Sequence, residues 1–101
     1  MSQRTVCFRV TGRVQGVGFR AYVQAKAREI GSSGWVANCS DGSVKGVITL
    51  SESLLPLFRE TLLTGPPQAR VEALEIEEAP ASSPAWLSRA GETFRIERDC
   101  L

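Results

Sequence analysis

The fold of this chain is decided near its N-terminus, by the stretch Thr5-Val-Cys-Phe-Arg-Val-Thr-Gly-Arg-Val-Gln-Gly-Val-Gly-Phe-Arg20. In residues 5–11 apolar side chains, among them Phe8, alternate with polar ones, which is typical of a half-buried strand. Three glycines then mark a loop, and from Phe19 onward the apolar residues recur at helical spacing. The stretch therefore predicts a strand, a glycine-rich loop and the start of a helix.

Outward from this stretch, periodicity and turn residues predict the rest of a single domain over residues 1–101. The expected elements are a helix over about 20–30, a strand over 35–40, a hairpin turn at Asp41-Gly42, a strand over 43–50, a helix over 54–64 with Ser53 as N-cap and Pro56 in its first turn, a strand over 70–77 with a bulge near 73–74, and a last strand over 93–98 with Phe94 and Ile96 facing in. This order predicts an α+β, ferredoxin-like βαββαβ sandwich. Its antiparallel sheet has four strands plus a short C-terminal fifth, and both helices lie on one face.

The composition excludes several classes of protein. The chain has 101 residues, of which 43% are hydrophobic and 23% charged, as in an ordinary globular domain. Its formal net charge of +1 does not suit a protein that holds nucleic acid mainly by bulk charge. No stretch reaches the apolar length of a membrane span. We expect a free-standing cytoplasmic monomer that binds neither nucleic acid nor membrane.

The residue types that the chain lacks limit the reactions that it can catalyse. It has no histidine, which excludes Ser-His-Asp and Cys-His catalysis and His-ligated zinc. Its cysteines, Cys7, Cys39 and Cys100, are odd in number and lack CxxC spacing, so neither a metal site nor a disulfide scaffold is expected. Any reaction must therefore use carboxylates, arginines, amides, hydroxyls or backbone N–H groups.

The loop between the first strand and the first helix has the features of an anion site. Glycines allow backbone N–H groups to converge at a helix N-terminus, where the helix dipole favours negative charge. Arg20 stands at the end of the loop, placed to grip the same anion with two N–H donors. The segment is neither a P-loop nor a dinucleotide-binding fingerprint. The alternative is a glycine-rich turn beside an exposed arginine.

The loop sequence Gly12-Arg-Val-Gln-Gly-Val-Gly-Phe-Arg20 resembles the signature of the acylphosphatase family. Other stretches that carry the resemblance are Gly34-Trp-Val-Ala-Asn38, the turn Asp41-Gly42, the segment Gly65-Pro-Pro-Gln-Ala-Arg-Val71 and, more weakly, Phe94-Arg-Ile96. The likeness covers about residues 5–78 and presents two spaced motifs in the right structural order.

The resemblance implies hydrolysis of the carboxyl–phosphate bond of a small acyl phosphate, with neither metal nor organic cofactor. It implies that Arg20 binds the phosphate and Asn38 orients the attacking water. The implied phosphate cradle consists of Gln15, Gly16, Val17, Gly18, Phe19 and Arg20. It also suggests that the last strand pairs with the second, which leaves a Cys39–Cys100 bond open, although we expect three thiols.

Three features carry alternative interpretations. Asn38 could instead cap the hairpin turn at Asp41-Gly42, because asparagine is common in turns. The connection over 79–91 contains Trp86-Leu87, which is expected to pack onto the sheet, or otherwise to form a rim or dimer contact. The acidic residues of the fourth strand are interpreted as a solvated face rather than an acid–base pair. They are Glu72, Glu75, Glu77 and Glu78.

Rival functions come from other classes. An RNA-recognition domain shares the element order, but the third strand lacks the aromatic residues that stack bases. A non-catalytic acyl- or carbamoyl-phosphate binding module, or a catalytically idle interaction protein, would also fit the loop. The presence of both Arg20 and Asn38 favours the enzyme.

Overall fold

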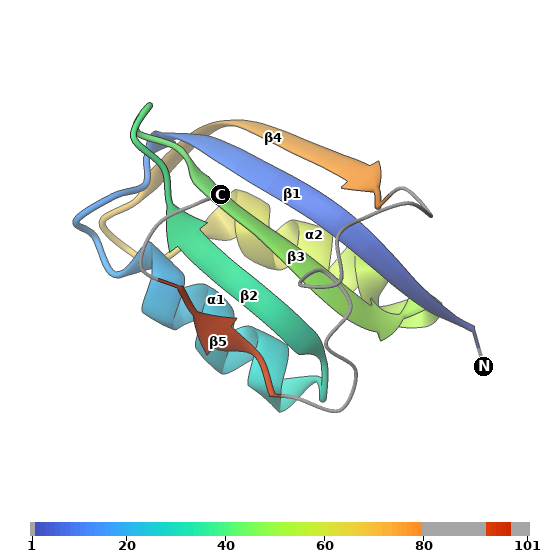
Figure 1. Ribbon diagram of the computed structural model, residues 1–101. Helices are drawn as coiled ribbons and strands as arrows, with labels where there is room; N and C mark the ends of the chain where they lie inside the picture. The colour runs from blue at the N-terminus through green and yellow to red at the C-terminus, as the bar shows by residue number, and fades with distance from the viewer. Residues whose placement is uncertain (1, 80–92, 98–101) are drawn as a thin grey trace.

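The computed structural model describes residues 2–79 and 93–97 (Figure 1). In chain order its elements are β1 (Gln3–Arg13), α1 (Phe19–Glu29), β2 (Ser33–Asn38), β3 (Val44–Ser51), the 3-10 turn η1 (Glu52–Leu54), α2 (Leu55–Thr64), β4 (Arg70–Glu78) and β5 (Arg95–Ile96). The predicted order of strands and helices is confirmed, with bounds shifted by a few residues. Neither helix in this part of the chain is long and apolar enough to cross a membrane.

The strands form one sheet in the order β4-β1-β3-β2-β5. The first four pair antiparallel, whereas β5 runs parallel to β2, with Val36 opposite Ile96. The expectation of a purely antiparallel sheet is therefore wrong for the fifth strand, although its predicted pairing with the second strand is confirmed. β5 follows β4 in the chain but lies at the opposite edge of the sheet, beside β2.

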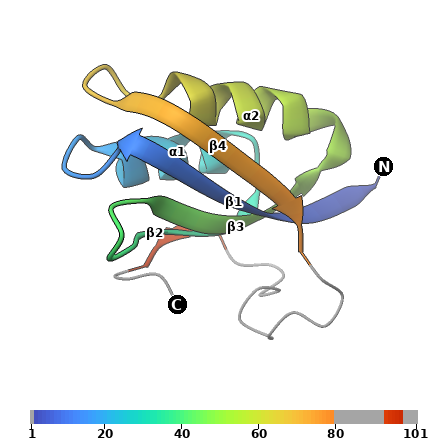
Figure 2. The ribbon, with the colours of Figure 1, turned by 90° about the horizontal axis from the view of Figure 1, so that it is seen from above.

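Both helices cover one face of the sheet (Figure 2). Alternation along β1 turns Val6, Phe8 and Val10 toward the helices, as predicted, and all three are buried. Phe8 meets Phe58 of α2 edge to face, with ring centroids 5.4 Å apart. The helices add further buried apolar residues, namely Phe19, Val23 and Ala27 from α1 and Leu62 from α2. This core fixes the end of β1 and the start of α1, between which the glycine loop lies.

The start of the second helix differs from the prediction. Ser53 does not cap it, because the chain first makes the 3-10 turn η1 and the α-helix begins at Leu55. The hydroxyl of Ser53 lies 3.2 Å from that of Ser51 instead of bonding a helix N–H. Pro56 does fall in the first turn, where its missing N–H costs no hydrogen bond.

The fourth strand contains the predicted bulge, at Glu72. Thr11 pairs with Ala73 and Gly12 with Val71, so Glu72 is the extra residue on β4. The bulge brings Val71 onto the core side together with Leu74 and Ile76. The acidic residues of this edge strand are exposed, as expected.

The cysteines differ from the expectation of three thiols. Cys39 is disulfide-bonded, whereas Cys7 is a free thiol whose pKa is raised by burial. The spacing of the cysteines could not decide this, because a disulfide requires the fold to bring two backbones close together. Cys100 and the Trp86-Leu87 pair lie outside the described residues.

Candidate functional site

The glycine loop spans from the end of β1 to the start of α1 and is pinned at both ends. Val14 and Phe19 are each 1% exposed and pack into the core. Between them, Gly16 and Gly18 have φ values of 74° and 81°. A Cβ atom at either glycine would meet nothing within 4 Å, so the backbone conformation, rather than space, favours glycine here.

The loop ends in an open helix N-terminus. Gly18 is the N-cap of α1 and has no side chain with which to bind the first N–H groups. The first turn carries no acidic residue. The N–H of Tyr22 donates to the carbonyl of Gly18, at 3.0 Å. The N–H groups of the first turn thus keep their capacity to bind an anion, at the positive end of the helix dipole.

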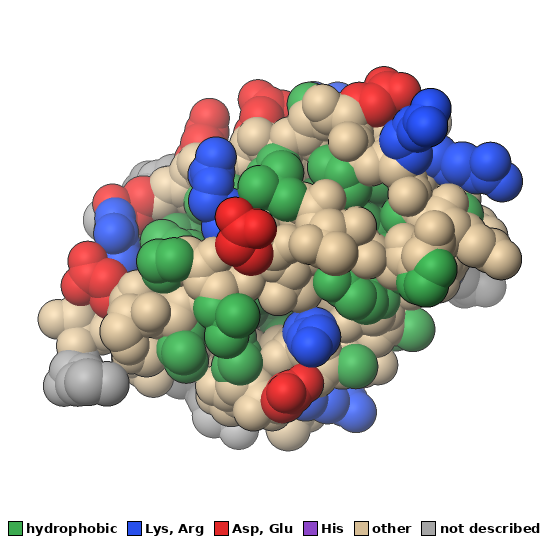
Figure 3. All heavy atoms as spheres, turned by 180° about the vertical axis from the view of Figure 1, so that it is seen from behind, with side chains coloured by type: hydrophobic (Ala, Val, Ile, Leu, Met, Phe, Trp, Pro, Cys, Tyr) green, Lys and Arg blue, Asp and Glu red, His purple; other side chains and the backbone are tan. Residues whose placement is uncertain are grey.

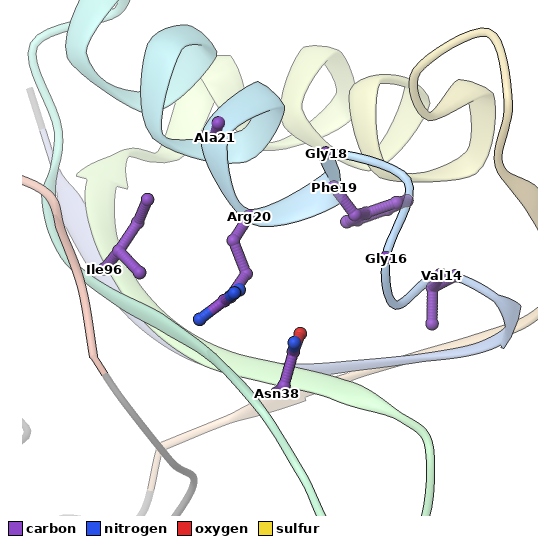
Figure 4. Close-up of a pocket in the computed structure, with 8 residues that line it drawn as sticks. All are labelled: Val14, Gly16, Gly18, Phe19, Arg20, Ala21, Asn38 and Ile96. Atoms are coloured by element: carbon purple, nitrogen blue, oxygen red, sulfur yellow. The ribbon is translucent and has the colours of Figure 1, made fainter.

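Arg20 extends from this first turn into the space beneath the helix (Figure 4). Among the described residues it makes neither an ion pair nor a hydrogen bond. By contrast, Arg4 and Arg9 of β1 each bind two carboxylates. A cation at a helix N-terminus is electrostatically unfavourable unless an anion joins it. The position of the Arg20 guanidinium is therefore suited to binding an anionic ligand.

Asn38, the last residue of β2, lies across from Arg20, and both side chains project into the same space (Figure 4). Its Oδ1 atom is buried and has no hydrogen-bond partner in the described structure. The neighbouring hairpin turn is held by Asp41, whose Oδ1 accepts hydrogen bonds from Ser43 N at 2.9 Å and Ser43 Oγ at 2.6 Å. The turn thus has its own cap, which argues against the capping interpretation of Asn38.

Gln15 joins the loop to this hairpin. Its Nε2 atom donates to the carbonyl oxygens of Cys39 at 2.7 Å and Ser43 at 2.9 Å. The side chain therefore holds the loop at a fixed distance from the end of β2, where Asn38 stands. Sequence reasoning placed Gln15 in the cradle through its backbone and missed this role, because its partners lie 24 and 28 residues away.

The loop, helix start and strand ends enclose a pocket of about 210 Å³. Its lining residues are Val14, Gly16, Gly18, Phe19, Arg20, Ala21, Asn38 and Ile96. The structure thus brings together five of the seven site residues expected from the sequence. Gln15 instead bonds the hairpin, and Val17 packs against the core, so neither lines the pocket.

Ile96 is a lining residue that sequence reasoning missed. It was expected to face the core with Phe94, but Phe94 is fully buried while Ile96 is 38% exposed and borders the pocket. Alternation along β5 does place both side chains on one side of the sheet. The core ends between them, and a local pattern gives no sign of where a core ends.

The chain is similar to known proteins both in sequence and in structure. A protein-family model described as Acylphosphatase matches residues 6–96. An acylphosphatase of Salinibacter ruber is 40% identical over 101 residues, 96% of this chain and 96% of that protein. The crystal structure of acylphosphatase from Bacillus subtilis is similar with a TM-score of 0.82 at 31% identity, over 95% of this chain and 99% of that chain. A carbamoyltransferase HypF of Synechocystis sp. is 44% identical over 81 residues, which are 79% of this chain but 10% of that protein.

Proposed function

The chain belongs to the acylphosphatase family, and we propose that it hydrolyses acyl phosphates at the pocket between α1 and β2. In this proposal Arg20 and the N–H groups of the 15–19 loop hold the phosphate, and Asn38 orients the attacking water. The water oxygen attacks phosphorus, and the bond from phosphorus to the bridging oxygen breaks. The bonding electrons leave with the acyl carboxylate, and the water proton passes to a phosphate oxygen.

The observation that carries the proposal is the guanidinium of Arg20, which has no partner among the described residues, at a helix N-terminus without a side-chain cap. Positive charge from the side chain and from the helix dipole is directed at one small pocket, and none of its described lining residues is acidic. Such a site suits a phosphate, because phosphoryl transfer depends mostly on positioning and on stabilising charge on the phosphoryl oxygens.

The leaving group explains why these residues suffice. An acyl phosphate releases a carboxylate, whose conjugate acid has a pKa of about 4, so no general acid is needed. The chain has no histidine, and none of the described residues that line the pocket is acidic, so none of them could serve as one. A phosphomonoester releases an alkoxide, which is far harder to expel, so we expect the site to discriminate against it.

Benzoyl phosphate hydrolysis by the purified protein in excess chelator tests the proposal. We expect turnover by the wild type and a loss of about 10²–10³ in kcat/KM for Arg20→Ala, the usual effect of removing one preorganised charge contact. Arg59→Ala removes an exposed arginine from α2 and serves as the matched control, with wild-type turnover. An alkyl phosphomonoester should not be hydrolysed. Near-normal turnover by Arg20→Ala would contradict the role of Arg20.

A second candidate function is that of a non-catalytic phosphate-binding module. It is favoured by the similarity to a segment of a carbamoyltransferase, a much larger protein. A folded wild-type protein that binds inorganic phosphate in a titration, but turns over neither benzoyl nor carbamoyl phosphate, would support this candidate instead.

A further inference from the structure

The pocket has a polar part and an apolar end. The glycine loop, Arg20 and Asn38 form the polar part, and Ile96 lies on the far side of Arg20 from Gly16 (Figure 4). Ala21, on the first turn of α1, also lines the pocket and carries only a methyl group. If phosphate occupies the polar part, the apolar end is left for the group attached to it.

Ile96 is held firmly at this end by contacts on both sides. Its neighbour Phe94 is fully buried, and the Phe94 carbonyl accepts a hydrogen bond from Arg28 Nε of α1 at 3.1 Å. On the other side, Glu97 N donates to the carbonyl of Val36 in β2 at 2.9 Å. The hydrogen bonds on both sides of Ile96 therefore fix the position of its side chain at the border of the pocket.

Exposed apolar side chains are common, so the position of Ile96 matters more than its exposure. The large apolar residues exposed in the described part of the chain are Leu57, Leu63 and Ile96. Leu57 and Leu63 lie on α2, where the rear view shows apolar side chains scattered among charged ones (Figure 3). Of the three residues, Ile96 alone lines the pocket that contains Arg20 and Asn38.

The charges around Ile96 do not favour a charged substrate tail. Arg20 is the charged residue of the pocket lining, and in the proposed reaction the phosphate occupies it. The residues that flank Ile96, Arg95 and Glu97, form an ion pair with each other. Among the described residues, a carboxylate on the acyl group would therefore meet an apolar surface beside a cation, Arg95, that is already paired.

We propose that Ile96 is a specificity-determining residue that contacts the acyl group, so that the enzyme favours acyl phosphates with an apolar aryl or alkyl group. This inference rests on the proposed function, because it assumes that phosphate lies in the polar part of the pocket. Apolar contact with a group that does not react acts equally on substrate and transition state, so it lowers KM more than it raises kcat.

The test compares Ile96→Thr, which keeps the β-branched shape favoured in strands, with the wild type on benzoyl phosphate and acetyl phosphate. We expect the ratio of kcat/KM for benzoyl over acetyl phosphate to fall about threefold to tenfold, mainly through a higher KM for benzoyl phosphate. Leu63→Thr makes the same kind of change at a similarly exposed residue of α2 and should keep the wild-type ratio. An unchanged ratio in Ile96→Thr, with an active wild type, would overturn the inference.

A binding measurement separates this inference from the proposed function. Benzoylphosphonate and acetylphosphonate carry the same acyl groups on a bond that water does not cleave. We expect benzoylphosphonate to bind the wild type more tightly than acetylphosphonate, by a factor that falls in Ile96→Thr. If the wild type hydrolyses neither acyl phosphate but shows this difference, the proposed reaction fails while the apolar subsite stands. Equal loss of affinity for both phosphonates would overturn the subsite.

Discussion

Arginines on neighbouring elements of this molecule differ in how far carboxylates neutralise their charge. Arg9 contacts Asp41 at 2.7 Å and Glu75 at 3.1 Å, so its charge is neutralised within the fold. Arg20 has no such partner among the described residues. A guanidinium already bound by two carboxylates has few N–H donors left for a ligand, whereas Arg20 keeps all five. Composition alone could not separate these roles.

In the variant Asn38→Ala we expect turnover to fall while phosphate binding is retained. Asn38→Ala removes the amide that is proposed to hold water, so kcat for benzoyl phosphate should fall at least about 100-fold. Phosphate affinity should change little, because Arg20 and the loop N–H groups remain. Steady-state kinetics and phosphate titration by calorimetry measure the two effects.

Asn38→Asp provides the contrasting variant, since a carboxylate can hold water but repels phosphate. It should weaken phosphate binding where Asn38→Ala does not. If Asn38→Ala lost phosphate affinity as severely as turnover, the residue would be a phosphate ligand or a structural one, and the water-orienting role would be wrong.

At the scale of elements, the site depends on how the loop is attached to the β2–β3 hairpin. Gln15→Leu removes both hydrogen bonds from Nε2 while keeping most of the side-chain volume. The carbonyl of Cys39 still accepts from Gly42 N, and that of Ser43 from Cys39 N, so neither is left without a partner. We therefore expect a loss of about 1–3 kcal/mol in the free energy of unfolding, measured in urea.

The same variant should weaken phosphate binding, because the loop would no longer be held against the hairpin. Gln68→Leu, at an exposed position before β4, is the matched control and should change neither property. A Gln15→Leu protein with wild-type phosphate affinity would show that the loop keeps its shape without this link.

The elements differ in how far the sequence could predict them. Alternation in β1 and the helical spacing after Phe19 reflect burial that repeats over many residues, so a local pattern reveals them. β5 pairs through only two residues, and its direction depends on the connection that precedes it. The Gln15 side-chain bonds join residues 24 and 28 positions apart in the chain, so only the folded structure brings them together. The candidate site residues Arg20 and Asn38 were predicted from family-like motifs and not from periodicity.

At the scale of the whole molecule, arginines of the interior strand β1 link neighbouring elements. Arg9 lies opposite Glu75 of β4 on one side and opposite Lys45 of β3 on the other. A like charge directly across a sheet is destabilising, and Asp41, at the β2–β3 turn, offsets it by binding Arg9. Arg4 similarly binds Glu52 and Glu78, which joins η1 to β4. The fold therefore depends on ionised carboxylates at several places, and its stability should depend on pH.

Asp41 provides the clearest test of this dependence. Hydrogen bonds from Ser43 Oγ and N, and then the contact with Arg9, hold the pKa of its carboxyl well below the usual range. In the unfolded chain the pKa returns to about 3.9, so between the two values the unfolded state binds more protons. The stabilisation is therefore complete above about pH 5 and is lost as the pH falls from there toward the folded pKa.

Asp41→Asn should expose this contribution, because the amide oxygen can still accept from Ser43 while the charge is gone. The free energy of unfolding, measured in urea from pH 2 to pH 7, should be lower in the variant at neutral pH. The difference from the wild type should stay constant down to about pH 5 and shrink below it. Glu60→Gln, at an exposed site on α2, serves as the control, and its smaller difference from the wild type should not follow this profile. A difference for Asp41→Asn that stays the same from pH 7 to pH 2 would mean that the ionised form of Asp41 contributes nothing to stability.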